Sequence, residues 1–147
     1  MPKVSDLKTL DLFEIPQPST PTPASMDYRA EVSAMVGIAL KETDLDRHEV
    51  AMRMSRLLGD GAEVSKYMLD AWSSESRDAY NMPFYQAPIL ELVTDSLLFS
   101  NWLAVKRGGR LLIGKDTLCA ELGKLERQKE QAAKKIRDLK KIMGEME

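Results

Sequence analysis

The chain has 147 residues, of which 44% are hydrophobic, 30% charged and 6% aromatic, with 21 basic against 23 acidic side chains. This balance is typical of a soluble globular protein with one ordinary domain and an additional element. No apolar run approaches the roughly 18 residues that a membrane span needs, so we expect no membrane partner. The single histidine, His48, and the single cysteine, Cys119, exclude most His-based and thiolate-based sites. We therefore expect no enzyme activity, no cofactor and no metal, and a cytoplasmic location.

The first 25 residues differ in composition from the rest of the chain. Four prolines alternate with Ser and Thr between Pro16 and Pro23, and proline lacks the amide donor and favours extended neighbours. We therefore expect a flexible, disordered arm over residues 1–25. A protein partner is one possible ligand of this arm, and a mobile tail is the alternative. The candidate docking residues are apolar and precede the prolines: Val4, Leu7, Leu10, Leu12 and Phe13.

Residues 26–114 read as a run of short helices, with no alternation of strands and turns, so the predicted class is all-α. Ser25 is a candidate N-cap for a first helix. A second helix follows Asp46, which forms a capping box with Glu49. The inward face predicted for this helix is apolar and includes Val50, Ala51, Met54, Leu57 and Leu58. Gly59 and Gly61 then end the helix.

Two of the predicted helices, over residues 46–58 and 64–74, have the spacing of a helix-turn-helix. In the second, Val64, Met68, Leu69 and Trp72 share an apolar face. Small polar and charged side chains occupy the other face, where a DNA-reading helix presents them to the major groove. The candidate DNA-binding residues are Ser65, Lys66, Tyr67, Asp70, Arg47, Arg53, Arg56 and Arg77.

Charge favours the opposite interpretation of this pattern. Residues 26–114 contain ten Lys or Arg and thirteen Asp or Glu, whereas DNA-binding domains usually carry a basic surface. Two amphipathic helices joined by a glycine turn also occur in any helical bundle. Plain packing, with the arginines paired to Asp60, Glu63 and Asp70 on a solvated face, therefore remains an alternative.

A resemblance adds to this pattern. The chain reads V-S-K-Y-M-L-D-A-W-S-S-E-S-R over 64–77, M-P-F-Y-Q-A-P-I-L over 82–90, and L-V-T-D-S-L-L-F-S-N-W-L-A-V-K-R-G-G-R-L-L over 92–112. These segments resemble phage and prophage regulators of the lambda-repressor-like helix-turn-helix superfamily, close to the CII type. The resemblance covers about 46–113, and the five-residue turn from Gly59 to Glu63 departs from it.

The resemblance implies a sequence-specific transcription regulator that binds double-stranded DNA as an oligomer in a bacterial host. By position, Ser65, Lys66 and Asp70 would face the DNA, while Leu69 and Trp72 would hold the fold. The alternative function is a non-enzymatic adapter, in which a degenerate helix-turn-helix fold and a coiled coil bind proteins.

Residues 115–147 carry a heptad pattern, which predicts a long coiled-coil helix and a homodimer or higher oligomer. The d positions are Leu118, Leu125, Ala132, Leu139 and Met146, and the a positions are Leu122, Lys129, Ile136 and Met143.

The flanking charges of this helix favour an antiparallel pairing. In a parallel dimer Glu121 would face Glu126 of the partner, and Lys135 would face Lys140, both pairs of like charge. An antiparallel homodimer, or a different partner helix, avoids these pairs. Two alternatives stay open: the helix folds back on its own domain, or its basic residues contact phosphates.

Overall fold

The computed structural model describes residues 15–146. The apolar cluster from Val4 to Phe13, and any partner it binds, lie outside the described residues. The chain divides into two compact units, Met1–Arg110 and Leu111–Glu147, each of which is described by itself. Over the described range the structure is helical, with one isolated β-bridge and no strand, which confirms the all-α prediction. No helix in this range has the length and apolar character that a membrane span requires.

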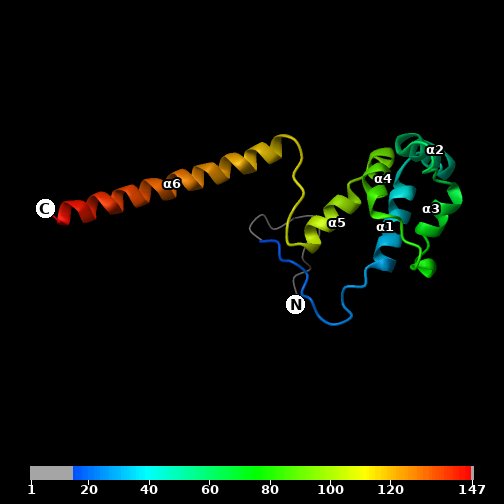
Figure 1. Ribbon diagram of the computed structural model, residues 1–147, viewed down its shortest axis with the longest axis horizontal. Coiled ribbons are helices and arrows are strands. Elements are labelled where there is room, and N and C mark those ends of the chain that lie inside the picture. Colours follow the sequence, from blue (N-terminus) through cyan, green and yellow to red (C-terminus); the bar gives the residue numbers. More distant parts are fainter. Residues whose placement is uncertain (1–14, 147) are drawn as a thin grey trace, which may run out of the picture. The chain divides into compact units, whose positions relative to one another are not determined.

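The first unit is a bundle of five α-helices and two short 3₁₀ turns (Figure 1). In chain order the elements are α1 (Arg29–Glu42), α2 (Arg47–Leu58), α3 (Lys66–Trp72), η1 (Glu75–Arg77), η2 (Phe84–Gln86), α4 (Ala87–Thr94) and α5 (Leu98–Lys106).

One apolar core holds the bundle together. Its fully buried side chains come from four helices: Val36 of α1, Val50 and Met54 of α2, Leu69 of α3 and Leu90 of α4. The helical spacing of residues 50, 51 and 54 places them on one face of α2, as the sequence predicts. The same prediction is wrong for Leu57, whose side chain is 55% exposed. Leu57 falls at the edge of the buried stripe, where α2 meets the surface.

The start of α2 follows the sequence prediction, and the start of α1 departs from it. Asp46 caps α2 by accepting a hydrogen bond from the Glu49 amide at 2.9 Å. Ser25 does not cap α1, which begins at Arg29 without a side-chain cap. The Ser25 hydroxyl instead donates to the Thr22 carbonyl at 2.8 Å and closes a local turn. Pro88 stands in the first turn of α4, where proline is tolerated because the amide it lacks would have no partner within the helix.

The described part of the proline-rich segment contacts the end of α5. The Ser19 amide donates to the Lys106 carbonyl at 3.1 Å, and Pro18 pairs with Arg107 across the isolated bridge. Gly108 (φ +76°) lies so close that a Cβ there would be 2.6 Å from the Pro18 nitrogen. The sequence does not predict this contact.

The second unit consists of α6 (Lys115–Glu145), a single helix of 31 residues. At 1.5 Å per residue it is about 46 Å long. None of its residues is buried. The long C-terminal helix predicted for residues 115–147 is thereby confirmed as a helix; its partner stays a prediction.

Candidate nucleic-acid interface

The turn between α2 and α3 is fixed by one serine side chain. Ser55 of α2 accepts a hydrogen bond from the Val64 amide at 2.9 Å, and its single hydroxyl proton has two carbonyl acceptors within reach, that of Ala51 at 2.8 Å and that of Val64 at 3.1 Å. Val64 is itself buried in the core, so the chain enters α3 at a defined position. Gly59 (φ +89°) and Gly61 (φ +82°) lie between α2 and α3 and have positive φ angles, which glycine adopts more readily than other residues. The structure thus contains a helix, a glycine turn and a second helix in contact.

Ser65 starts α3 by capping it. Its hydroxyl accepts from the Met68 amide at 3.2 Å, and its side chain is exposed. The helix has seven residues and is therefore about 10 Å long.

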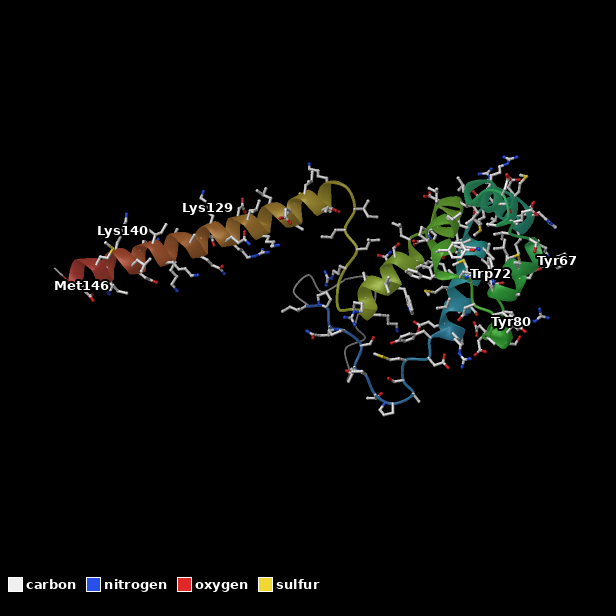
Figure 2. All side chains as sticks on the ribbon, in the orientation of Figure 1. Tyr67, Trp72, Tyr80, Lys129, Lys140 and Met146 are labelled. Atoms are coloured by element: carbon white, nitrogen blue, oxygen red, sulfur yellow. The ribbon has the colours of Figure 1, made fainter. Side chains whose placement is uncertain are left out.

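The two faces of α3 differ as the sequence pattern predicts. Leu69 and Trp72 are buried. Tyr67 is 79% exposed and points away from the bundle (Figure 2), while Lys66 and Asp70 are about one-third exposed. The polar strip that we expected on α3 is therefore a surface of the bundle, which none of the described helices α1 to α5 covers.

Three of the candidate residues form one charge network on this strip. One carboxylate oxygen of Asp70 lies 2.6 Å from the guanidinium of Arg47 on α2, and the other lies 2.9 Å from the ammonium of Lys66. Arg47 also donates to the Ser73 hydroxyl at 3.1 Å. The Lys66 ammonium and the Arg47 guanidinium lower the pKa of Asp70, because both stabilise its charged form. One carboxylate shared by two cations leaves a single net positive charge.

The remaining arginines do not join this network. Arg53 pairs with Glu49 one turn earlier on α2, at 2.7 Å. Arg56 approaches the Met52 sulfur at 3.8 Å and, with Arg53 and Leu92, borders a shallow depression on the surface. Arg77 is exposed on η1. Of the five predicted phosphate-binding cations, the structure brings together Arg47 and Lys66.

Sequence reasoning missed two features of this surface. Ser55 orders the turn, and Ser73 extends the charge network, although neither belongs to a motif. Helical spacing indicates Ser73 only as an outward residue. Arg47 and Asp70 are 23 positions apart in the chain, so no local signal indicates that the two side chains meet.

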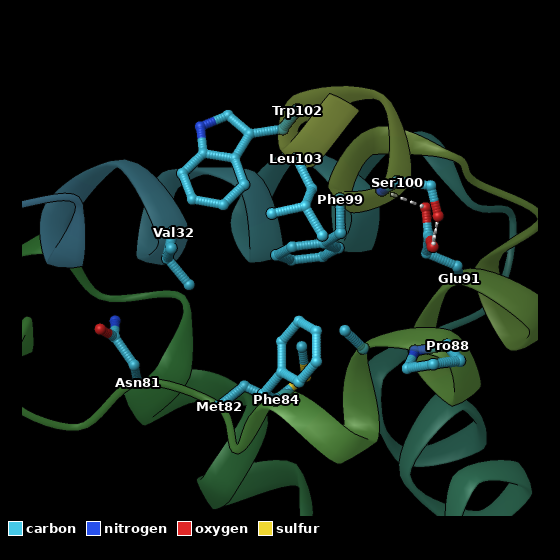
Figure 3. Close-up of a pocket in the computed structure, with 11 residues that line it drawn as sticks. Val32, Asn81, Met82, Phe84, Pro88, Glu91, Phe99, Ser100, Trp102 and Leu103 are labelled. Atoms are coloured by element: carbon cyan, nitrogen blue, oxygen red, sulfur yellow. Dashed lines mark hydrogen bonds between the residues drawn. The ribbon is translucent and has the colours of Figure 1, made fainter. Parts of the chain in front are cut away.

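An apolar groove opens elsewhere on the bundle. It encloses about 340 Å³ between α1, the segment before α4, and α5 (Figure 3). Phe84, Phe99 and Leu103 line it, and Phe84 is 79% exposed. At one side Glu91 is buried and accepts hydrogen bonds from the Ser100 hydroxyl at 2.5 Å and the Ser100 amide at 3.2 Å. The Glu91 carboxylate thus bonds an amide in the first turn of α5 that has no partner within the helix, and this is a structural role.

Over 15–146 no group of three or more His, Cys, Asp or Glu side chains is placed to hold a metal ion. The chain matches no family model, and comparisons with curated proteins and with solved structures likewise gave no match.

Proposed function

We propose that this protein is a DNA-binding transcription regulator of the phage or prophage type, which binds double-stranded DNA without catalysing a reaction. The observation that supports it most is the exposed polar face of α3, held out from the core by the Ser55-anchored turn. In this proposal α3 enters the major groove. Tyr67 and Asp70 face the base edges, and Ser65 opens the helix next to the phosphates.

Arg47 and Lys66 contact the backbone in this proposal. They stand on α2 and α3 and flank the same carboxylate, so both lie at the edge of the strip. Two phosphate contacts in each bundle correspond to a slope of about −2 in a plot of log affinity against log salt. Such a footprint is small. A second bundle on the same oligomer doubles the number of contacts and raises the effective concentration at the second half-site.

The test is a titration of a fluorescently labelled random duplex of 30 base pairs with the full chain, followed by anisotropy from 50 to 300 mM KCl. We expect binding that weakens linearly on the double-logarithmic plot. Replacing Lys66 by Ala should weaken binding and make the slope shallower by about one per bundle. The matched control is Lys124→Ala, which removes the same charge from the outer face of α6.

A protein-binding adapter is the second candidate, and the apolar groove beside Phe84 favours it. Adapters of this kind need no phosphate contacts. No binding of the duplex at 50 mM KCl, or equal losses for Lys66→Ala and Lys124→Ala, would contradict the regulator and favour the adapter.

A further inference from the structure

The apolar stripe of α6 runs along the whole helix. Every side chain in the stripe is exposed, and a single helix has no interior in which to bury them. Their spacing alternates three and four residues, which is the seam of a two-stranded coiled coil. The seam residues are Leu118, Leu122, Leu125, Lys129, Ala132, Ile136, Leu139, Met143 and Met146.

A parallel dimer in register would have unfavourable contacts at the middle of this seam. Lys129 would face Lys129 of the second copy, because a positions meet a positions in parallel pairs. One layer further on, Ala132 would face Ala132 and leave a gap. The like-charged pairs made by Glu121 and by Lys135 add to this cost on the flanks.

An antiparallel pairing matches the seam from Leu118 to Met143. Each a position then meets a d position of the second copy. Leu118 pairs with Met143 of the second copy, Leu122 with Leu139, and Leu125 with Ile136. The outer layers are therefore large apolar pairs, and the centre of this register coincides with the middle of α6.

The central layers explain the two odd residues in the seam. Lys129 meets Ala132 of the second copy, and Ala132 meets its Lys129. The small methyl group leaves room for the lysine stem to lie across the seam while its ammonium reaches water. Glu121 and Glu126 of the first half of α6 also lie level with the second half of the partner helix, in which Lys and Arg outnumber Asp and Glu.

We propose that α6 binds a second copy of this chain in an antiparallel homodimer with this register. The first residues of the two helices then lie at opposite ends of the coiled coil, about 46 Å apart. A parallel dimer would place them within about 10 Å of each other.

The single cysteine provides the test without any mutation. Cys119 is exposed and flanks the seam near the start of α6. A nitroxide on Cys119 of the full chain, measured by double electron–electron resonance, should give a distance centred at about 35 Å, since 23 residues of helix separate the two labels along the axis. A parallel dimer would give about 15 Å, the width of the coiled coil plus the labels.

The control is Cys119→Ser combined with Gln131→Cys, which moves the label to the middle of α6. Both orientations bring these labels to the same level, so a short distance is expected and reports that the dimer has formed. A short distance from Cys119 overturns the antiparallel register, and a monomer mass for the labelled protein overturns the dimer. Because no DNA is present, these outcomes are independent of the duplex titration.

Discussion

The bundle buries many of its apolar side chains, whereas α6 exposes all of its own. The bundle collects Val36, Met54, Leu69 and Leu90 into one core with no exposed surface on any of them. α6 has a regular apolar stripe of similar residues and buries none of them. Both regions obey the same helical periodicity. The difference is that several helices can cover one another, whereas a single helix requires a second one.

The comparison also separates two kinds of exposed helix face. The face that α3 leaves uncovered is polar and carries Tyr67, Lys66 and Asp70, whereas that of α6 is apolar with charged flanks. A polar strip loses little by remaining in water and suits hydrated, charged ligands such as DNA. An apolar seam gains free energy only when it is removed from water.

The largest expected effect tests whether the bundle depends on its core. Trp72 is 7% exposed and packs in that core, so Trp72→Ala should lower the free energy of unfolding by about 3–5 kcal/mol. The matched variant on the same helix is Tyr67→Ala, which should change it by less than about 0.5 kcal/mol because Tyr67 is 79% exposed. Urea unfolding followed by circular dichroism measures both. Equal effects would mean that α3 does not have one buried and one exposed face.

A smaller loss in the free energy of unfolding is expected for a change in the turn between α2 and α3. Ser55→Ala leaves the Val64 amide and carbonyl without their side-chain partner, so we expect a loss of about 1–3 kcal/mol in the same urea experiment. Ser76→Ala is the control, because its hydroxyl bonds only the neighbouring exposed Ser74 hydroxyl. If both variants unfold like the wild type, the turn does not depend on Ser55.

The smallest effect concerns the charge network. The pKa of Asp70 is lowered in the folded chain, so its ion pairs stabilise the fold above the ordinary aspartate pKa of about 4, and this stability is lost as pH falls through the lowered value. Unfolding free energy should therefore decline below pH 4, and less steeply in Asp70→Asn.

Asp27→Asn is the comparison for that pH profile. Arg29 lowers the pKa of Asp27 to about 2, but this partner is only two residues away, so the contact can persist in the unfolded chain. Arg47 reaches Asp70 from 23 residues away and meets it only in the folded chain. Identical pH profiles for Asp70→Asn and the wild type would show that the network does not contribute to stability.

The sequence predicts those features that depend on near neighbours. Asp46 caps α2 three residues before its bonding partner, Gly59 ends the helix, and the stripe of α6 follows from its spacing alone. The outward direction of Ser65 and the inward direction of Trp72 also follow from periodicity, whereas the same periodicity places Tyr67 only near the edge of the exposed face. These features require no knowledge of how the helices pack.

Most of the features that escaped prediction join distant segments. Asp70 neutralises Arg47 across the α2–α3 junction, Pro18 pairs with Arg107, and the groove forms where α1 and α5 meet the residues before α4. One miss is local: spacing gave Ser25 the role of a cap, yet its hydroxyl accepts from the Thr22 amide and donates to the Thr22 carbonyl, and bonds no amide of α1. Three of the five candidate cations pair with carboxylates: Arg53 with Glu49 and Lys66 with Asp70 within one helix, and Arg47 with Asp70 across two helices.

The most direct test of both exposed faces is one sedimentation-velocity experiment on the full chain, with and without a random 30-base-pair duplex at 50 mM KCl. We expect twice the mass of one chain in the absence of DNA, and a heavier species that absorbs as nucleic acid when the duplex is added. A species with the mass of a single chain, whose sedimentation the duplex leaves unchanged, would contradict both assignments.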